Sequence, residues 1–246
     1  MRFAVRLSFN GNDYFGWQSQ EGENTVQDII SGVLRIRYNR PIEITGCCRT
    51  DSGVHASDFL FHFDFEEDIR DDFINSINKM LPPQIALHDI RLVPDNFHSR
   101  FDAVSRSYVY YIHIKKDPFK YGFSFYFPVL AKADFELMNK ATEIIKKYQE
   151  FYPFCKSKSD VKTMKCNIEQ LDWIKTENGF AMQIKADRFL RGMVRLIVGA
   201  CINTGLYKIS PEELEQSLNN QERLKKSWSV PAHGLFLNEV KYLTQD

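Results

Sequence analysis

Four segments among the first hundred residues alternate apolar and polar positions, which predicts strands with one buried face. These segments span residues 3–9, 42–45, 59–65 and 85–92. Between them, apolar residues recur twice at helical spacing, once after Asn24 and once before Pro82. Asn24 is placed to cap the first helix, with Gln27 three residues later. The predicted order of elements is therefore βαββαβ.

The same order returns after residue 104. Strands are predicted at 108–114, 168–173, 180–184 and 235–242, and helices at 135–148, 190–204 and from Ser210. The two middle strands flank Glu177-Asn178-Gly179, which is a hairpin signal. Ser210-Pro211-Glu212-Glu213 combines a capping box with a proline at the first helical position. The second half therefore predicts another βαββαβ unit.

Two such units indicate an α+β protein built from ferredoxin-like folds, in which helices cover one face of each sheet. We expect an N-terminal domain at residues 1–104 and a C-terminal domain at 105–246. Side by side, the two sheets would form one continuous, mostly antiparallel sheet with an active-site cleft between the units. This duplication rests on the order of elements, because no sequence repeat accompanies it.

Composition and cysteine usage narrow the class of protein. Of the 246 residues, 43% are hydrophobic and 26% are charged, which excludes disorder as the dominant state. No apolar stretch is long enough to cross a bilayer, and the N-terminus lacks a signal core, so we expect a cytoplasmic protein with no membrane partner. The cysteines include the adjacent pair Cys47-Cys48 but no close C-x-x-C spacing, and we interpret all five as reduced thiols, mostly buried.

Acidic and basic residues balance at 32 each, but they are distributed unevenly along the chain. Residues 1–104 contain 10 basic and 16 acidic side chains, and residues 105–246 contain 22 and 16. The second half would therefore supply most of the attraction for a polyanion. Part of this charge lies in a basic loop with Lys156, Lys158, Lys162 and Lys165, for which simple solubility is the alternative explanation.

The loop at residues 46–56 brings an arginine, an aspartate and a histidine close together in sequence: Arg49, Asp51 and His55. Asp51-Ser52-Gly53 is a turn signal, and turn chemistry alone favours an aspartate that only caps its own backbone. However, a hairpin connection needs only about two to five residues, and long polar loops on a rigid sheet often hold functional sites. Both interpretations of Asp51 stay open at this level.

Three arginines of the second half recur at i, i+3 and i+7, so a helix from Leu190 would stack Arg188, Arg191 and Arg195 on one face. That face is either a solvated basic stripe or a binding surface. Arg195 lies in an apolar run, and its burial would require a carboxylate partner. Asp51 is chemically suitable, because an adjacent guanidinium keeps a carboxylate ionised.

The strand that begins the second half is rich in tyrosine. Tyr108 and Tyr110 share one face, and Tyr111 lies on the other. Aromatic rows in strands usually pack in a core. On an open sheet they would instead offer rings that stack on an unpaired base.

In these regions the sequence resembles the tRNA pseudouridine synthase A family. Arg49-Thr50-Asp51-Ser52-Gly53-Val54-His55-Ala56 resembles the family's active-site motif, R-T-D-A-G-V-H-A. Further segments resemble the family's other motifs, in the family's order, from about Phe3 to Tyr242: Phe9-Asn10-Gly11, Tyr14-Phe15-Gly16-Trp17-Gln18, Thr25-Val26-Gln27, Leu81-Pro82-Pro83, Phe97-His98-Ser99-Arg100-Phe101, Arg106-Ser107-Tyr108-Val109-Tyr110, Phe189-Leu190-Arg191-Gly192-Met193-Val194-Arg195 with Ile197-Val198-Gly199, and Pro231-Ala232-His233-Gly234-Leu235.

The resemblance implies conversion of uridine to pseudouridine in RNA, without a cofactor or a metal. By the family's pattern, Asp51 is the catalytic nucleophile, Arg195 is its salt-bridge partner and Tyr108 stacks on the target base. Arg49 would contact the RNA and help to extrude that base. Three further residues are candidate RNA contacts: His55, Arg188 and Arg191. The family's usual substrate is the anticodon stem-loop of tRNA at positions 38–40, bound by a homodimer.

Some positions depart from the family's pattern and leave alternatives open. Asn10 replaces an aspartate, Cys47-Cys48 replace small residues and Ser52 replaces an alanine. Because the catalytic set survives, one alternative is a paralogous synthase that acts on another RNA position. A non-catalytic RNA-binding module is another, although a carboxylate in its binding loop would repel phosphate. A metal-dependent hydrolase is the third, and it is disfavoured because the histidines at 55, 62 and 98 lack ligand spacing.

Overall fold

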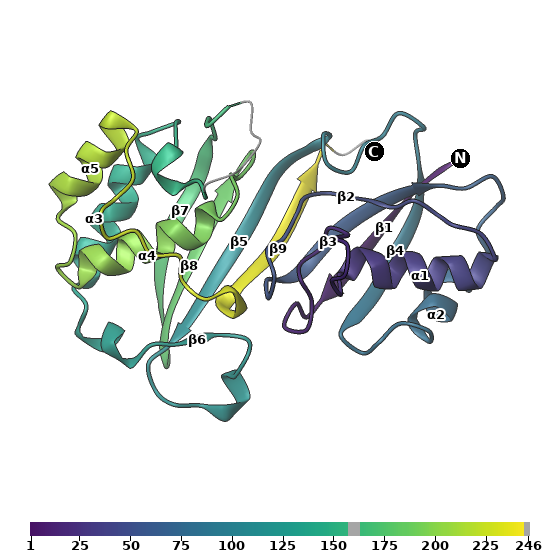
Figure 1. The fold of residues 1–246 in the computed structure, drawn as a ribbon, viewed down its shortest axis with the longest axis horizontal. Helices are drawn as coiled ribbons and strands as arrows, with labels where there is room; N and C mark the ends of the chain where they lie inside the picture. The colour runs from purple at the N-terminus through teal and green to yellow at the C-terminus, as the bar shows by residue number, and fades with distance from the viewer. Residues whose placement is uncertain (157–162, 244–246) are drawn as a thin grey trace. The chain divides into compact units, whose positions relative to one another are not determined.

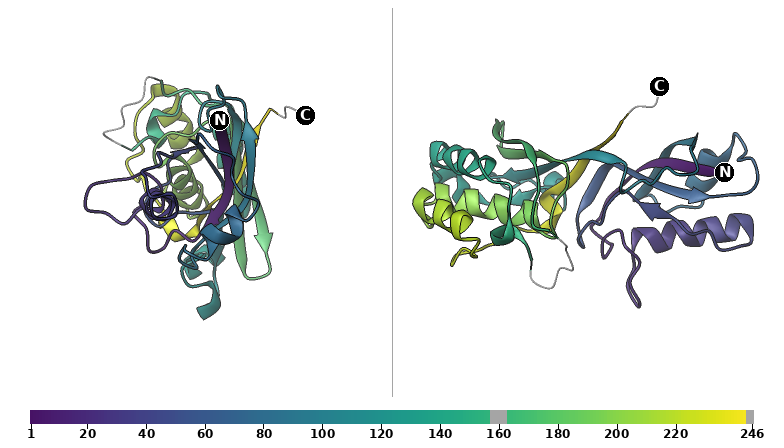
Figure 2. Two further views of the ribbon diagram at one scale, coloured as in Figure 1. Left: turned by 90° about the vertical axis from the view of Figure 1, so that its right-hand side faces the viewer. Right: turned by 90° about the horizontal axis from the view of Figure 1, so that it is seen from above.

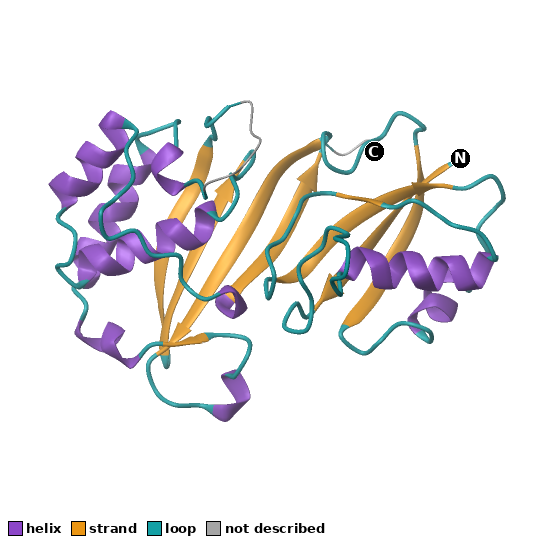
Figure 3. Ribbon diagram, viewed as in Figure 1, coloured by secondary structure: helices purple, strands orange, loops and turns teal. Residues whose placement is uncertain are grey.

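Strands and helices follow one another along the chain much as the hydrophobic pattern predicts, and the expected α+β class is confirmed (Figures 1 and 3). The structure is a computed structural model that describes residues 1–156 and 163–243. It divides into two units: unit 1 comprises Met1–Val104 and the segment from Phe236 onward, and unit 2 comprises Ser105–Leu235. The division after Val104 coincides with the boundary expected between 1–104 and 105–246, whereas most of the last strand groups with unit 1. The assignment of two separate domains stays a prediction.

Unit 1 shows the βαββαβ order that the sequence predicts. Its elements are β1 (Arg2–Phe9), α1 (Val26–Tyr38), β2 (Thr45–Gly46), β3 (His55–Asp64), α2 (Phe73–Asn78) and β4 (Ile85–Val93), joined by β9 (Leu235–Tyr242). The strands β4, β1 and β3 lie in that order as antiparallel neighbours. β2 pairs with Phe61 and His62 of β3, whereas β9 runs parallel to His55 and Ala56. The order β4-β1-β3-β2 is the one expected of a ferredoxin-like unit.

Aromatic side chains fill the layer between this sheet and its helices. Trp17 stacks on Phe59 with ring centroids 4.2 Å apart, and Phe73 of α2 stacks on Phe63 of β3 at 6.2 Å. α1 lies along one side of the strands (Figure 2). It buries a stripe of residues at helical spacing: Val26, Ile30, Val33 and Leu34. The alternating phenylalanines of the strands therefore form the core of unit 1 with these helices.

The expectation that Asn24 caps the first helix is wrong. Thr25 is the N-cap of α1, and its hydroxyl accepts a hydrogen bond from the N–H of Asp28 at 3.2 Å. Asn24 instead donates its side-chain amide to the carbonyl of Asp13. Gln27 also uses its side chain for backbone groups of neighbouring loops rather than for a capping box. These two amides therefore hold the loops around the helix start.

Unit 2 contains the second series of strands and helices. Its elements are β5 (Ala103–His113), β6 (Phe125–Tyr126), α3 (Phe135–Lys146), β7 (Ile168–Thr176), β8 (Gly179–Ala186), α4 (Met193–Gly205) and α5 (Pro211–Asn220), with the short 3₁₀ helices η1 (Pro118–Lys120), η2 (Pro128–Lys132), η3 (Tyr152–Phe154) and η4 (Ala232–Gly234). β7, β8 and β5 are antiparallel neighbours in that order, and β6 runs parallel to β5. The three α-helices pack together beside these strands (Figures 1 and 2). The hairpin between β7 and β8 and the capping box of Ser210 are confirmed.

The helix expected from Leu190 begins later. Its first residue is Met193, and the N-cap Gly192 has the left-handed φ of 71°. A residue in that conformation cannot be part of a right-handed helix. Arg188 and Arg191 therefore precede α4, and only Arg195 lies on it. The expectation that these three arginines form one helical stripe is wrong.

Three further features bear on function. No helix in the described part of the chain combines the length and the apolar character that a membrane span requires. Over residues 1–156 and 163–243, histidine, cysteine and carboxylate side chains form no group that could hold a metal ion. Four of the five cysteines are buried, as expected from their sequence context.

Candidate active site

Asp51 opens a tight turn in the loop between β2 and β3. The N–H of Val54 donates a hydrogen bond to the main-chain carbonyl of Asp51 at 3.1 Å. Gly53 occupies the third position of the turn with φ of 76°, which favours glycine. The side chain of Asp51 is partly exposed. The turn is thus closed by main-chain atoms, which define the backbone conformation at Asp51.

The carbonyl of Tyr14 holds this turn from the loop that precedes α1. It accepts hydrogen bonds from the N–H of Gly53 at 3.2 Å and from the hydroxyl of Ser52 at 3.3 Å. Tyr14 itself is buried, and burial raises the pKa of its phenol. The backbone immediately after Asp51 is therefore fixed by a residue that lies far away in the sequence.

Two glycines let the same loop approach the turn closely. A Cβ atom on Gly16 would lie 2.2 Å from the carbonyl oxygen of Thr50, and one on Gly11 would lie 2.0 Å from that of Val54. Both distances are shorter than any van der Waals contact, so these positions exclude a side chain. Gly16 also has φ of 86°, a conformation that other residues rarely adopt. Loop 10–24 is therefore in backbone contact with both ends of the turn.

His55 connects the turn to the sheet. Its ring is 1% exposed, and its Nδ1 accepts a hydrogen bond from the N–H of Gly11 at 3.1 Å. The ring also stacks on Phe236 of β9, with centroids 4.4 Å apart and planes inclined by 20°. An accepting Nδ1 carries no proton, so this bond requires the neutral imidazole with its proton on Nε2. The expected role of His55 as an RNA contact stays a prediction, and its described contacts position the loop.

Loop 10–24, the clamping loop, is itself anchored in the core of unit 1. The carbonyls of Gly16 and Trp17 accept hydrogen bonds from N–H groups in the first turn of α1, at 3.2 and 3.0 Å. Trp17 is 1% exposed and stacks on Phe59. Gly46 packs so closely on this indole that a Cβ would lie 2.4 Å from its Nε1. A continuous path of packed groups therefore connects the core of unit 1 with Asp51.

The spacing of residues in the sequence does not identify Gly11, Tyr14 and Gly16 as residues that hold the candidate nucleophile. They appeared only as parts of a motif that resembles the family's opening segment. The available signal was the recurrence of glycine in a polar stretch that follows a predicted strand, which often marks close backbone approach. The partner of that approach, more than thirty residues further along, could not be read from spacing.

In unit 2, Arg195 lies on α4 beside the segment that precedes β9. Its Nε donates a hydrogen bond to the carbonyl of Val230 at 2.7 Å, and the N–H of Val230 donates to the carbonyl of Arg195 at 3.4 Å. The guanidinium is partly buried. Because the guanidinium is planar, a hydrogen-bonded Nε also fixes the directions in which its two terminal nitrogens can donate. Arg195 is thus an oriented cation.

Tyr110 packs beneath this arrangement. It is fully buried, and its hydroxyl donates to the carbonyl of Pro231 at 2.8 Å. Burial raises the pKa of this phenol well above its usual value, although the charge of Arg195 acts in the opposite direction. A Cβ on Gly234 would lie 2.8 Å from the Tyr110 ring, which explains why the turn there is glycine. Of the two alternatives for this aromatic row, packing in the core holds for Tyr110, and Tyr108 is also buried, at 8% exposure.

Tyr108 lies two residues earlier on the same face of β5. Its ring meets Phe189 edge to face, with centroids 5.2 Å apart. Its neighbour on β8 is Ile184. Phe189 lies in the segment between β8 and α4 that also carries the remaining arginines. Tyr108 and the arginine segment therefore belong to one region of unit 2.

The other predicted RNA contacts lie at or near the surface. Arg49 and Arg191 are exposed, and Arg188 is partly exposed. The carbonyl of Arg191 accepts from the N–H of Lys156 at 3.0 Å, which fixes the backbone at that point. Exposed guanidinium groups suit phosphate oxygens. Their roles in RNA binding stay predictions.

Only part of the predicted basic loop is described. The side chain of Lys156 lies against Gly192, close to where a Cβ would be. The ammonium of Lys165 lies 3.9 Å from a carboxylate oxygen of Glu150. Lys158 and Lys162 lie outside the described residues.

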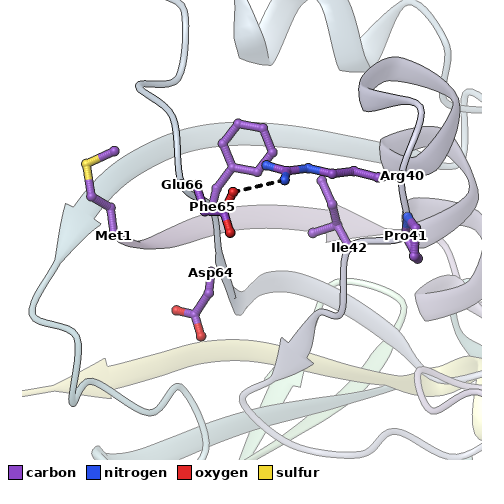
Figure 4. Close-up of a pocket in the computed structure, with 7 residues that line it drawn as sticks. All are labelled: Met1, Arg40, Pro41, Ile42, Asp64, Phe65 and Glu66. Carbon is purple, nitrogen blue, oxygen red and sulfur yellow. Dashed lines mark hydrogen bonds and ion pairs between the residues drawn. The ribbon is translucent and has the colours of Figure 1, made fainter.

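Unit 1 also contains a hollow that none of the predicted site residues line (Figure 4). Arg40 crosses it, with its guanidinium 3.3 Å from Glu66 and 4.6 Å from the centroid of the Phe65 ring. Asp64, also in the lining, is bonded to Arg2 at 2.7 Å. None of the predicted site residues is among those that line the hollow. This hollow is therefore separate from the site predicted at the Asp51 turn.

Comparison with known proteins gives one consistent result. Residues 148–243 match a family model described as tRNA pseudouridine synthase. The chain is 40% identical over 243 residues to the tRNA pseudouridine synthase A of Parabacteroides distasonis, covering 98% of this chain and 96% of that protein. The proteins of the same name from Bacteroides thetaiotaomicron and Bacillus subtilis are 37% and 33% identical, covering 98% of this chain and 90% and 99% of their own lengths.

Proposed function

Because the chain belongs to the tRNA pseudouridine synthase A family, we propose that Asp51 is the nucleophile with which it isomerises uridine to pseudouridine in tRNA. The observation that carries this proposal is the turn Asp51–Val54, which has the family's motif and is clamped to the core on both sides. A nucleophile on a fixed backbone needs little reorganisation to reach its target atom. A merely capping aspartate would not require this clamp.

The isomerisation exchanges one bond of the nucleoside for another. The N1–C1′ glycosidic bond breaks, the uracil turns over, and C5 bonds to C1′. The C5 proton is released to solvent, and N1 gains a proton, so the product has the same composition as the substrate. A carboxylate that attacks either the sugar carbon or the base can hold the intermediate covalently while the base turns. Asp51 suits either attack.

Arg195 and Tyr108 are the proposed partners of Asp51 from unit 2. We assign to Arg195 the role of keeping the carboxylate ionised, since an oriented guanidinium stabilises the charged form. The bond from its Nε to Val230 holds this side chain within unit 2. We assign to Tyr108 the stacking contact with the target uracil. A stacked ring returns about 1–3 kcal/mol per base, against the few kcal/mol that extrusion costs.

We propose the anticodon stem-loop of tRNA, at positions 38–40, as the target, and a homodimer in the cytoplasm as the working form. The family likeness supports all three statements. Arg49, Arg188 and Arg191 would contact the phosphate backbone around the flipped nucleotide, and His55 would hold the loop that carries Arg49 and Asp51. A paralogue with another target position would keep the same catalytic set.

Incubation with tRNA that carries tritium at uridine C5 tests the function. Release of label to water, followed by mapping of pseudouridine to positions 38–40, is the expected result. Binding without release would select the RNA-binding module instead. Loss of activity with a chelator would select metal-dependent chemistry. Release with pseudouridine at other positions would retain the enzyme and replace the target.

A further inference from the structure

We propose that the loop between β5 and β6, residues 114–124, is a second RNA-binding element of unit 2, in which exposed aromatic rings stack on unpaired bases while lysines contact the phosphates. This inference rests on the proposed function, because RNA is its partner. In Figure 3 this loop extends beyond the end of β5 and carries a short helix, η1.

The first observation is the exposure of two rings. Phe119 is 92% exposed and Tyr121 is 87% exposed, more than any other large apolar side chain of the described residues. Phe123 and Tyr126, which follow along the chain, are 43% and 44% exposed. A row of rings in water is costly and commonly marks a binding surface. Phe119 and Tyr121, as the most exposed rings of this row, are suited to a planar partner.

The second observation is the defined conformation of the segment that presents the rings. The carboxylate of Asp117 caps η1 by accepting a hydrogen bond from the N–H of Phe119 at 3.0 Å. Further turn bonds follow, from the N–H of Lys120 to the carbonyl of Asp117 and from the N–H of Phe123 to the carbonyl of Lys120. Exposure of the rings is therefore a property of an ordered turn. Stacking on such a turn loses little conformational entropy.

The base of the loop is packed on the part of unit 2 that holds Arg195. β6 pairs with the end of β5, and Phe125 lies beside Phe127 with centroids 5.2 Å apart. Both rings pack against Trp228, at 5.9 and 5.5 Å. Trp228 is two residues before Val230, whose carbonyl binds Arg195. One packed region therefore supports both the loop and the candidate catalytic arginine.

The charge of the loop favours a polyanion over a second copy of the chain. Residues 114–124 contain three basic side chains, Lys115, Lys116 and Lys120, and one acidic side chain, Asp117. Asp117 is used by the η1 cap and lies 4.0 Å from Lys120. Two such loops facing one another across a symmetric interface would bring like charges together. Lysines interleaved with rings are instead the composition of surfaces that bind single-stranded nucleic acid.

Two double variants distinguish stacking of the rings on bases from simple apolar contact with the RNA. Phe119→Leu with Tyr121→Leu keeps apolar side chains but removes the rings, whereas Phe119→Tyr with Tyr121→Phe keeps the rings. We expect the leucine variant to raise the KM for tRNA about tenfold or more, with kcat within about twofold of the unchanged protein. The ring-keeping variant should stay within about twofold in both. Equal behaviour of the two variants would overturn the proposal.

Binding measurements keep this result distinct from failure of the proposed function. Affinity for the anticodon stem-loop and for a blunt RNA duplex is measured by anisotropy, which does not need turnover. The leucine variant should lose affinity for the stem-loop and keep its affinity for the duplex, in which the bases are paired. If the protein shows that pattern but releases no tritium, the proposal for the loop stands and the proposed synthase function is rejected. Normal stem-loop binding by the leucine variant would reject the loop and leave the synthase untouched.

Two further measurements test whether the lysines contact phosphates and whether the loop instead binds a second copy of the chain. Lys115→Gln with Lys116→Gln should reduce the salt dependence of stem-loop binding by about one to two phosphate contacts. An unchanged salt slope would contradict the electrostatic part of the proposal. The mass in solution of the leucine variant should equal that of the unchanged protein. A drop in mass would show that the loop is an interface between copies, and it would overturn the assignment to RNA.

Discussion

The main-chain N–H of Gly11 donates a hydrogen bond to Nδ1 of His55 across 3.1 Å, joining two segments that are far apart in the sequence. Gly11 lies two residues after the end of β1, and His55 is the first residue of β3, directly after the turn of Asp51. The imidazole is buried and stacked on Phe236, so its position is well defined. This bond makes the placement of the candidate nucleophile depend on a residue that need not touch the RNA.

Replacement of His55 should separate positioning from contact. His55→Asn places an amide oxygen near the position of Nδ1, and it should keep most of the turnover. His55→Ala leaves a buried N–H without an acceptor and should cost about 1–3 kcal/mol of stability and lower kcat more than it raises KM. Steady-state kinetics with tRNA, beside thermal unfolding, measure both effects. A KM effect alone, equal in both variants, would instead support direct RNA contact by His55.

Gly16→Ala should displace the turn. Its Cβ would meet the carbonyl of Thr50, so either the turn or loop 10–24 must move. We expect at least a tenfold loss of kcat, because misplacement by about 1 Å can cost about a hundredfold. Gly22→Ala is the matched control: its φ is 78°, comparable to that of Gly16, but nothing lies within 4 Å of a Cβ there. Single-turnover rates of the two variants are compared. Equal rates would show that backbone strain, rather than the contact, accounts for the effect.

The stability of unit 1 should depend on pH through His62. Burial lowers the pKa of this imidazole to about 4, and its Nδ1 accepts from the N–H of Ser99 at 3.2 Å. The folded protein favours the neutral ring, so the unfolded chain binds more protons between about pH 6.5 and 4. Stability should therefore be complete above that window and fall as the pH decreases through it.

The loss is expected to reach about 1–2 kcal/mol at pH 5 for the one histidine. His62→Asn keeps an acceptor for the Ser99 N–H but does not titrate in this range. Denaturant unfolding at pH 7.5 and pH 5 gives the difference for each protein. The variant should show a smaller loss than the unchanged chain. Identical losses would assign the pH dependence to other groups.

The strands and helices of this chain were largely readable from the sequence because apolar spacing reports directly which face of an element is buried. Two local details were not. Asn24 was expected to cap α1, but the side chain of Thr25 caps it. The helix expected from Leu190 starts only after Gly192, whose left-handed backbone cannot be inferred from hydrophobic spacing. Such helix ends depend on the local capping geometry, which includes the choice of capping side chain and the backbone conformation at the cap.

The candidate site was readable only in part. The motif around Asp51 marked the residue, but the approach of Gly11, Tyr14 and Gly16 depends on contacts between segments separated by more than thirty positions. Tyr108 and Tyr110 were correctly placed on one face of a strand, yet spacing could not say that Tyr110 is core. The exposure of Phe119 and Tyr121 also had no signal in periodicity, since exposed and buried rings look alike in a sequence.

The central claim is that the carboxylate of Asp51 performs the chemistry. Asp51→Asn removes the charge with little change in shape, and Asp13→Asn, a comparable exchange at an exposed position of the clamping loop, is the control. Release of tritium from C5-labelled tRNA is measured for each under single-turnover conditions, together with the affinity for the same RNA. We predict that Asp51→Asn binds tRNA within about threefold of the unchanged protein and releases no label above background, whereas Asp13→Asn releases it normally. Release at the normal rate by Asp51→Asn would contradict the account.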